Sequence, residues 1–451
     1  MLRRRFTPLF GTAPAFIRSL SGKAAEKPNI LWIIAEDNGP QWNCYGYKGV
    51  ETPNIDRLAG EGARFQHAHS TGPVCSASRS AFNVGLYQTT TGTHLHRSHR
   101  KDGYRLPEGA RLVSHRLRDA GYFTANVREF ASGLRGTGKT DFNFTAEKPF
   151  DGTHWNQRAA GQPFFAQVNF QATHKGPAFS EARKLPNLVD PHKVELPPYW
   201  PDHPVVRDEY ANYLDCVQLL DRQVGALLDV MKKDGALDNT VIFFFGDNGR
   251  CLIRGKQWCY DAGTHVPLLV KWPGMVKPGT VRHDPAILLD VTATTLAAAG
   301  VEIPSWFHGR PLFGSGAQPR DSVVTARDRC DMTVDRIRCV RDARYSYIRN
   351  FMPEKPYTQH NDYISKQYPT LGVMKQLHAQ GKLNAAQSLF MAARKPDVEF
   401  YDMQSDPHEV RNLASDPKYA KLVAQYSARL DKWLAETKDR GGEPVLPDDS
   451  N

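Results

Sequence analysis

The sequence lacks any stretch of roughly 18 apolar residues, the length that a membrane-spanning helix needs, so we expect no membrane span. Its 35 glycines and 31 prolines show no period, which excludes a collagen-like or low-complexity chain. Of its 451 residues, 40% are hydrophobic and 24% are charged, a balance too apolar for a disordered chain. What is left is a globular protein, long enough for one large α/β domain with an appendage.

Cysteine is scarce, and its arrangement does not indicate a disulfide framework or a zinc ribbon. The seven cysteines are an odd number, and no two have the CxxC spacing. Spacing alone leaves two pairs open, Cys251 with Cys259 and Cys330 with Cys339. At least one cysteine is therefore free for a role of its own.

A strong basic excess is absent once the first residues are set aside. The net charge is +10, but residues 1–25 hold five basic residues and no acid, so the rest of the chain carries about +5. No basic run interleaved with aromatics follows, which argues against a nucleic-acid partner.

The first residues combine a basic start, a modest apolar middle and small side chains, the order of an export signal. Arg3-Arg4-Arg5-Phe6 also resembles the twin-arginine type. A disordered tail or an organelle transit peptide is the alternative. We expect residues 1–25 to lie outside the folded body and the protein to be periplasmic or extracellular.

Short apolar runs alternate with helical patterns over the first two thirds of the chain. The expected strands are 29–35, 122–127, 164–170, 241–245 and 268–272, and the expected helices are 53–60, 112–120 and 208–233. This alternation predicts an α/β fold with a large, doubly wound, mostly parallel sheet flanked by helices. Ligands of such sheets bind beyond the carboxyl ends of the strands.

The pattern changes near residue 320. Short strands are expected at 336–340, 345–349 and 398–402, a helix is expected at 422–437, and residues 352–397 look irregular except for a helical stretch near 384–394. We therefore expect a catalytic domain at 26–320 and a smaller α+β subdomain at 321–451. Nothing in the pattern predicts an oligomeric state.

Two acidic pairs follow strands of the predicted sheet. Glu36-Asp37 comes after one strand and Asp247-Asn248 after another. Carboxylate and amide oxygens from neighbouring strand ends form a hard site suited to Ca²⁺ or Mg²⁺. Either pair alone is more often a helix cap or a turn, but two pairs on one sheet favour a metal site.

The segment Cys75-Ser-Ala-Ser-Arg79 places a cysteine where a loop meets a helix. A helix N-terminus stabilises anions, so we expect it to lower the pKa of the Cys75 thiol. The alternative is a buried, inert cysteine, which the small and polar neighbours make less attractive.

With this segment, the sequence resembles the type I, formylglycine-dependent sulfatases of the alkaline-phosphatase-like superfamily, whose signature is C-x-(P/A)-S-R. Further stretches resemble the same family in order along the chain: PNILWIIAEDNG, TPNIDRLAGEGARFQHAHS, Gly138-Lys139, Pro163 to His174, FGDNG at 245–249, KQWCYDAGTHVP, and FYDM at 400–403 with Asp406-Pro407 and Asn412-Leu413-Ala414. Residues 327–349 and 357–368 resemble the sulfamidase-like subgroup.

The resemblance implies a role for each matching residue. Cys75 would be converted to formylglycine by a maturation enzyme, and its aldehyde hydrate would attack the sulfur of a sulfate ester. Arg79 would hold that hydrate, Lys139 and Lys256 would neutralise sulfate oxygens, and His174 would protonate the leaving oxygen. One Ca²⁺, with Mg²⁺ as the alternative, would be held by formylglycine and four side chains, those of Glu36, Asp37, Asp247 and Asn248.

Two positions depart from the family pattern. Glu36 stands where an aspartate is usual, and Asp141 stands where a histidine is usual. Among the clustered histidines 94, 96 and 99, His94 and His96 are candidates for substrate binding or proton transfer in its place. A metal site there and a solvated loop are the alternatives. Lys175 and His265 are weaker candidates for the pocket.

These residues predict a sulfuric ester hydrolase whose substrate is a sulfated carbohydrate. The alternatives are an N-sulfoglucosamine sulfohydrolase and a phosphonate or phosphodiester hydrolase of the same superfamily. A rival from another class is an inactive sulfated-glycan binder, in which Cys75 stays a thiol.

Overall fold

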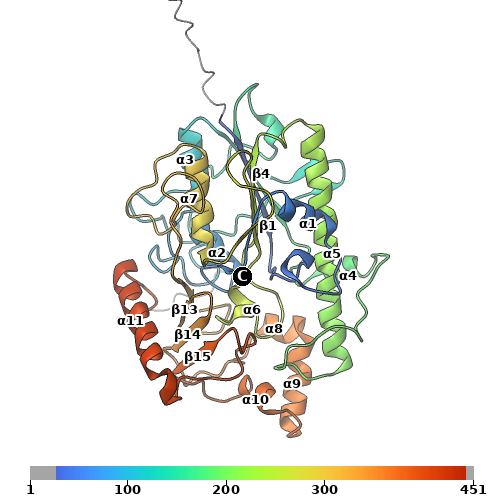
Figure 1. Cartoon of the computed structure of the whole chain (residues 1–451), viewed down its shortest axis with the longest axis vertical. Helices are drawn as coiled ribbons and strands as arrows, with labels where there is room; N and C mark the ends of the chain where they lie inside the picture. The colour runs from blue at the N-terminus through green and yellow to red at the C-terminus, as the bar shows by residue number, and fades with distance from the viewer. Residues whose placement is uncertain (1–26, 443–451) are drawn as a thin grey trace, which may run out of the picture.

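A seven-stranded sheet forms the centre of the protein in the computed structural model, which describes residues 27–442 (Figure 1). Its order is β10-β2-β9-β8-β1-β7-β4. The strands are β1 (Asn29–Ala35), β2 (Ala63–Phe65), β4 (Phe123–Val127), β7 (Phe164–Phe170), β8 (Thr240–Gly246), β9 (Leu268–Lys271) and β10 (Thr280–Arg282). Only β9 runs antiparallel to its neighbours, so the sheet is mostly parallel, as predicted. The expected export signal at 1–25 lies outside the described residues.

Strand β1 contributes to two separate cores because its side chains alternate between the faces of the sheet. Leu31 and Ile33 pack in the core that includes α1 (Pro53–Gly60) and α5 (Pro204–Lys233). Ile30 and Trp32 pack in the opposite core with α2 (Cys75–Phe82), α3 (Val113–Asp119) and α7 (Leu288–Ala298). The two helical layers lie on either side of the sheet in Figure 1, which confirms the doubly wound fold.

Helix α5 begins at Pro204, four residues before the predicted start. The side chain of His203 accepts a hydrogen bond from the amide of Val205 and so caps the helix. Proline suits the first turn, where its missing N–H has no intrahelical partner. The capping histidine is an uncommon cap residue, which is why the sequence pattern does not show this start.

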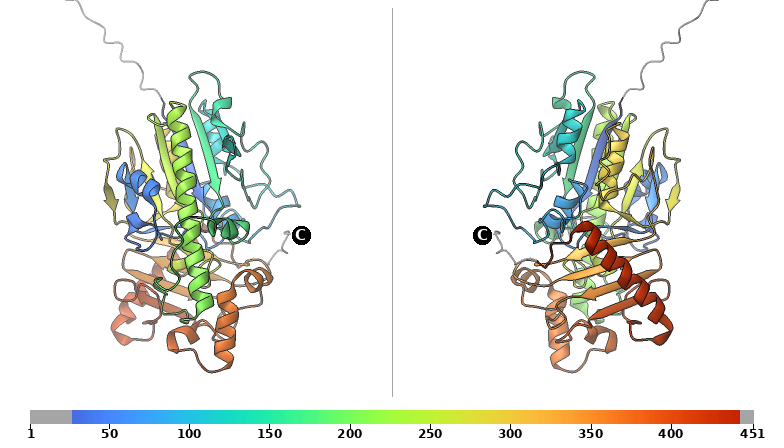
Figure 2. Two further views of the ribbon diagram at one scale, coloured as in Figure 1. Left: turned by 90° about the vertical axis from the view of Figure 1, so that its right-hand side faces the viewer. Right: turned by 90° about the vertical axis from the view of Figure 1, so that its left-hand side faces the viewer.

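A second, antiparallel sheet follows the first. It consists of β12 (Val323–Arg327), β13 (Ile337–Arg341), β14 (Tyr345–Asn350) and β15 (Val398–Asp402), and the sequence analysis misses β12. Helix α11 (Ala420–Thr437) packs Tyr426 and Leu430 against this sheet (Figure 2). The smaller α+β subdomain is therefore present, while its boundary at residue 320 stays a prediction.

In the segment 352–397, the helical stretch expected near 384–394 is present as residues 385–389, but residues 362–367 and 369–379, which were expected to be irregular, are also helical. This segment forms α8 (Asp362–Gln367), α9 (Pro369–Ala379) and α10 (Ala385–Leu389). Helix α9 buries Leu371 and Met374 in the core shared with α5, and the Glu209 carboxylate of α5 accepts the Thr370 amide at 3.0 Å. Tertiary contacts hold these short helices, so the local pattern does not reveal them.

The remaining elements are short. They are η1 (Asn43–Tyr45), β3 (Ala68–His69), β5 (Glu129–Ala131), β6 (Leu134–Arg135), η2 (Trp155–Gln157), α4 (Pro177–Ala182), α6 (Asp261–Thr264), β11 (Ala286–Ile287) and η3 (Pro417–Tyr419). Between residues 27 and 442, no helix is both long and apolar enough to cross a membrane. All seven cysteines lie in this part of the chain as free thiols, so neither pair left open by the spacing is a disulfide here.

Candidate active site

The acidic pairs meet at the carboxyl edge of the central sheet, because β1 and β8 are adjacent and parallel. The Asp37 amide donates to Asp247 Oδ1 at 2.9 Å, and Asn248 Nδ2 donates to Asp37 Oδ1 at 2.9 Å. Glu36 and the other three side chains are buried. Strand pairing therefore brings together two pairs of side chains that about half of the chain separates in the sequence.

Asp37 has a left-handed backbone conformation, with φ at +56°. This region is uncommon for residues other than glycine and costs of the order of 1 kcal/mol. The hydrogen bonds to Asp247 and Asn248 hold the Asp37 backbone and carboxylate in this conformation. The strain lies at a predicted metal ligand, where a fixed geometry is useful.

Cys75 is the first residue of α2, and its side chain faces the first acidic pair. Its Sγ lies 3.4 Å from Asp37 Oδ1 and 3.7 Å from Glu36 Oε1. Burial raises the pKa of the Cys75 thiol well above its ordinary value, and the Asp37 carboxylate raises it further. The expectation of a lowered pKa is wrong, because burial and the nearby acid outweigh the helix N-terminus. Unmodified Cys75 is a protonated thiol, poorly suited to attack as a thiolate.

Arg79 lies one turn further along α2 and is also buried. Its Nε donates to Asp247 Oδ2 at 2.8 Å, and Nη1 donates to Asn169 Oδ1 at 2.7 Å. Its Nη2 is buried without a hydrogen-bond partner among the described residues. Asn169, near the end of β7, is missed by the sequence analysis, although it is a polar residue at the carboxyl end of an apolar strand.

Two lysines pair with the first acidic pair. The Lys139 ammonium contacts the Glu36 carboxylate, and Lys256 Nζ donates to Asp37 Oδ2 at 2.8 Å. Burial alone would raise the pKa of Asp37, but Lys256 and His174 outweigh it and hold that pKa at about 2. The site therefore contains two cations positioned beside the carboxylates that face Cys75.

The loop that carries Lys256 is folded tightly. The Gly249 amide donates to the Gly263 carbonyl at 2.9 Å. A Cβ on Gly249 would lie 2.3 Å from the Ala262 carbonyl oxygen, so the position excludes any side chain. This close approach folds the loop back on itself, and Lys256 reaches Asp37 from it.

The residues at this edge fit a divalent cation. Ligand atoms of Glu36, Cys75 and Asp247 lie within 4.8 Å of one another. Asn248 Oδ1 is buried and accepts no hydrogen bond within residues 27–442, which is costly unless a ligand satisfies it. Burial raises the pKa of Asp247 to about 6 against the opposing charge of Arg79, and a cation would favour its ionised form. The oxygen-rich donor set suits Ca²⁺ or Mg²⁺.

His174 closes the cluster on its partly exposed side. Its Nε2 lies 3.6 Å from Glu36 Oε1 and 3.7 Å from Asp37 Oδ2. Tyr363 of α8 faces it, with ring centroids 6.4 Å apart, and Lys256 Nζ lies 5.6 Å from the tyrosine centroid. Tyr363 lies in the stretch 357–368 that resembles the sulfamidase-like subgroup, but the sequence does not predict it at the site, because it reaches the site from the second part of the chain.

Asp141 joins the cluster, and His96 lies near it. Asp141 Oδ2 is 3.2 Å from Lys139 Nζ, and its carboxylate also pairs with Arg100. His96 Nδ1 lies 2.9 Å from Asp331 Oδ1 and interacts electrostatically with Asp141. The position that departs from the family pattern therefore contacts a predicted sulfate-binding lysine.

The structure does not bring three of the weaker candidates into this cluster. Lys175 Nζ pairs with Glu209 at 2.6 Å, so it is directed to α5. His265 Nδ1 pairs with Asp261 at 3.1 Å. His94 is buried near Asp328 and Arg338. Lys175 and His265 thus pair with residues other than the predicted catalytic and metal residues, and His94 has other charged neighbours.

The histidines 94, 96 and 99 do not share a ligand either. His99 Nδ1 pairs with Asp102 at 2.6 Å and its ring stacks on Tyr104 with centroids 4.0 Å apart. Because the other two have the separate surroundings given above, a metal site made by these three histidines together is not supported.

Comparison with known proteins gives consistent matches. The Sulfatase family model matches residues 28–301, and a model described as N-sulphoglucosamine sulphohydrolase, C-terminal, matches residues 253–358. An ulvan-active sulfatase of Formosa agariphila is 32% identical, over 94% of this chain and 77% of its own length. The N-sulphoglucosamine sulphohydrolase of Homo sapiens is 26% identical, over 92% of this chain and 91% of its own.

A solved structure shares the fold, with a TM-score of 0.64 and 18% identity over 94% of this chain and 100% of the other. Its description is of a complex with its substrate, D-glucosamine-2-N,6-O-disulfate. The Sulfatase model covers more than half of this chain, and it includes the strand ends, Cys75 and both lysines. The chain therefore belongs to the sulfatase family and is a sulfuric ester hydrolase.

Proposed function

We propose that the protein removes sulfate from a carbohydrate by means of a nucleophile made from Cys75. The observation that carries this proposal is the position of Cys75 Sγ, 3.4 Å from Asp37 Oδ1, with Lys256 on the same carboxylate. A buried, protonated thiol is a weak nucleophile there. Conversion to formylglycine by a maturation enzyme would supply an aldehyde hydrate instead.

The other residues have roles that follow from their charge and position. Lys139 and Lys256 bind the sulfate oxygens and stabilise the charge that builds up on them. His174, on the partly exposed side of the cluster, donates a proton to the leaving oxygen. Arg79 orients the nucleophile with its unpartnered Nη2. A bound cation, held by Glu36, Asp37, Asp247 and Asn248, would withdraw charge from the sulfate.

The first candidate substrate is an O-sulfated saccharide. The relatives named above act on ulvan and on N-sulphoglucosamine, according to their descriptions. The match of residues 253–358 to the sulphohydrolase C-terminal model favours an N-sulfated glucosamine as the second candidate. We also propose export to the periplasm or the cell exterior, on the basis of the basic leader.

The first experiment is the mass of the peptide that contains Cys75, from protein co-produced with a formylglycine-forming enzyme. We expect the aldehyde in place of the thiol. A thiol at this position, while a control sulfatase in the same cells is converted, would overturn the catalytic proposal in favour of a glycan binder. Converted protein is then assayed on O-sulfated saccharides, N-sulfoglucosamine and an aryl phosphonate. Cleavage of the phosphonate alone would contradict the sulfatase activity.

The cation is tested by thermal unfolding of protein treated with a chelator. Addition of Ca²⁺ at about 100 times its dissociation constant stabilises the folded state by about 2.7 kcal/mol. Asn248→Ala removes the buried amide oxygen, so this variant should show a smaller Ca²⁺-dependent shift than the parent protein. An equal Ca²⁺-dependent shift in both proteins would show that Asn248 is not a ligand. A larger shift with Mg²⁺ than with Ca²⁺ would identify Mg²⁺ as the preferred metal.

A further inference from the structure

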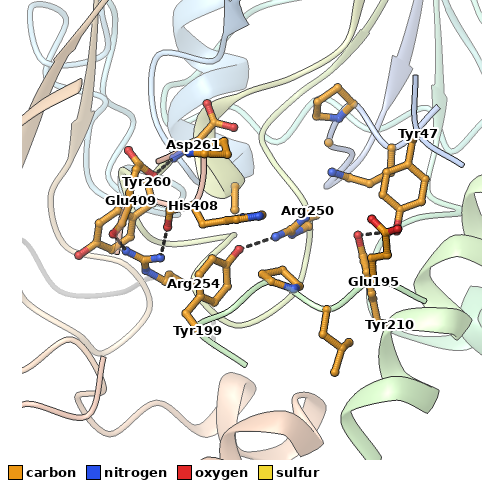
Figure 3. Close-up of a pocket in the computed structure, with 17 residues that line it drawn as sticks. Tyr47, Glu195, Tyr199, Tyr210, Arg250, Arg254, Tyr260, Asp261, His408 and Glu409 are labelled. Atoms are coloured by element: carbon orange, nitrogen blue, oxygen red, sulfur yellow. Dashed lines mark hydrogen bonds between the residues drawn. The ribbon is translucent and has the colours of Figure 1, made fainter. Parts of the chain in front are cut away.

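Figure 3 shows a cavity of about 320 Å³. It lies beside the reaction centre on the side of α5, which contributes Tyr210 to the lining. Residues 39–41, which follow the first acidic pair, form part of its wall, and Arg250 and Arg254, which follow the second pair, form another part. Residues 407–409 close it from the second part of the chain. Its volume is at the lower end of the range of small-molecule sites.

Arg250 lines this cavity and lacks a counter-ion. The residue is 7% exposed, and no ion pair of the described residues includes it. Its Nη2 donates to the Tyr199 hydroxyl at 2.6 Å, while its Nε is buried without a hydrogen-bond partner. A buried guanidinium with an unused donor is costly, and an anion in the cavity would remove this cost.

Arg254 adds a second buried guanidinium. It lies between two aromatic rings, 4.5 Å from the Tyr199 centroid and 3.9 Å from the Tyr260 centroid. It donates to the backbone carbonyls of His408, at 2.6 Å, and of Glu409. Its hydrogen-bond partners are carbonyls and not carboxylates, so Arg254, like Arg250, can still pair with a negatively charged occupant.

None of the acidic residues around the cavity forms an ion pair with Arg250 or Arg254, although Glu409 also interacts electrostatically with Arg254. Glu409 pairs with Arg341 at 2.7 Å, and Asp261 lies 3.3 Å from the same guanidinium. Glu195 is exposed. The three carboxylates are therefore directed to another arginine or to solvent.

Tyrosines supply most of the remaining lining. Tyr47, Tyr199, Tyr210 and Tyr260 all border the cavity, and the labelled side chains surround Arg250 in Figure 3. The Tyr47 and Tyr210 hydroxyls lie 2.8 Å apart. Aromatic faces pack against the apolar face of a sugar ring, and phenolic hydroxyls bond its polar edge. This combination suits an anionic sugar better than a bare ion.

We propose that this cavity binds a sugar that carries an oxyanion, a carboxylate or a sulfate group, at a subsite separate from the reaction centre. The inference that the ligand is a sugar depends on the proposed carbohydrate function. The inference that it carries an oxyanion depends only on Arg250, Arg254 and the tyrosines. The cavity is also linked to the sulfate-binding lysine, because the Lys256 amide donates to the Arg250 carbonyl at 2.8 Å.

The test uses the Cys75→Ala protein, which cannot turn over a substrate. Calorimetry compares the binding of glucuronate, of inorganic sulfate and of neutral glucose. Arg250→Gln, Lys139→Gln and Arg135→Gln are made in this background. Lys139→Gln alters the reaction centre, and Arg135→Gln alters an exposed arginine that does not line the cavity. We expect Arg250→Gln to weaken glucuronate binding about tenfold or more, and the two controls to leave it within about twofold.

Each result decides the proposal. Loss of glucuronate binding in Lys139→Gln but not in Arg250→Gln places the ligand at the reaction centre and overturns it. If inorganic sulfate binds at Arg250 as tightly as glucuronate does, the inference of a sugar ligand is overturned and the cavity is a site for a free anion. If neutral glucose binds as tightly as glucuronate, the inference that the ligand carries an oxyanion is overturned.

If Arg250→Gln does not fold, crystals of the Cys75→Ala protein soaked with glucuronate replace it. Density for the carboxylate beside Arg250 supports the subsite, and a cavity without glucuronate density overturns it. Failure of the proposed function appears separately, as converted wild-type protein that releases no sulfate from any saccharide, whatever the binding result.

Discussion

Arg79 and Arg338 are both buried arginines that pair with aspartates, but they use their donors differently. Arg338 donates to Asp439 and Asp328 and to two backbone carbonyls, so all three of its nitrogen atoms are bonded. Arg79 bonds Asp247 and Asn169 and leaves Nη2 without a partner in the described part of the chain. Arg338 of the second sheet thus has every nitrogen bonded, whereas Arg79, at the carboxyl edge of the first sheet, has one left over.

This difference indicates how a structural charge is distinguished from a functional one. Burial and ion pairing are common to both arginines, so neither property marks the active site. An unpartnered nitrogen alone does not mark it either, because Arg327 and Arg341 of the second sheet each leave Nε without a hydrogen-bond partner among the described residues. The position of the spare Arg79 donor, at the strand ends beside Asp247 and the strained Asp37, favours a functional role. Arg250 differs from Arg79, Arg327 and Arg341 because it has no ion pair among the described residues in addition to its unpartnered Nε, and it lines the cavity in Figure 3.

The largest expected effect comes from removing the nucleophile that Arg79 faces. Cys75→Ala should lower sulfate release at least about 1,000-fold, while the free energy of unfolding changes by only about 1 kcal/mol. Activity on a sulfated saccharide and thermal unfolding measure the two quantities. Cys44→Ala is the matched control, since Cys44 is a partly exposed thiol outside the site. Substantial turnover by Cys75→Ala would contradict a mechanism in which the nucleophile is made from Cys75.

Arg79→Lys tests the functional member of the pair. Lysine keeps a charge beside Asp247 but lacks the planar fork that also reaches Asn169. We expect kcat to fall about 100-fold, with a smaller loss of stability than in Arg338→Lys. A variant with normal kcat and a large stability loss would make Arg79 structural and end the distinction.

Arg338→Lys tests the structural member. Four of its five hydrogen bonds join β13 to Arg327, Asp328 and Asp439, and the fifth goes to the adjacent Ile337 carbonyl. Their disruption should lower the free energy of unfolding by about 3 kcal/mol, with kcat per folded molecule retained. Denaturant unfolding measures this, and Arg394→Lys, in an exposed pair with Asp397, should change it by less than about 0.5 kcal/mol.

The smallest effect is expected from Asp141→His, which restores the residue usual in the family. Asp141 has φ at +55°, and histidine is among the residues that tolerate this region. Lys139 keeps its pairing with Glu36, so kcat should stay within about tenfold of the parent value. A collapse of activity with unchanged Ca²⁺ binding would show that Asp141 has a role of its own.

The extent to which the sequence predicts the site depends on the range of the contact. Glu36, Asp37, Asp247 and Asn248 could be predicted, because each pair directly follows a buried strand and parallel strands share a carboxyl edge. The lowered pKa expected for Cys75 was wrong, because it rested on the helix end and not on the burial and the acids that surround the thiol. Lys175 and His265 pair with Glu209 and Asp261 and not with the residues around Cys75, so their part in binding substrate stays a prediction.

By itself, the sequence determined the alternation of strands and helices, the two acidic pairs and the CSASR segment, because these depend on local periodicity and on residues close together in the chain. Only the tertiary structure decided that β12 and the helices α8 and α9 form, that Tyr363 reaches Lys256, and that Arg250 has no ion pair within residues 27–442. These features depend on contacts between distant segments, whose partners no local pattern specifies. Burial, which sets the charge state of Cys75, is likewise a property of the whole fold.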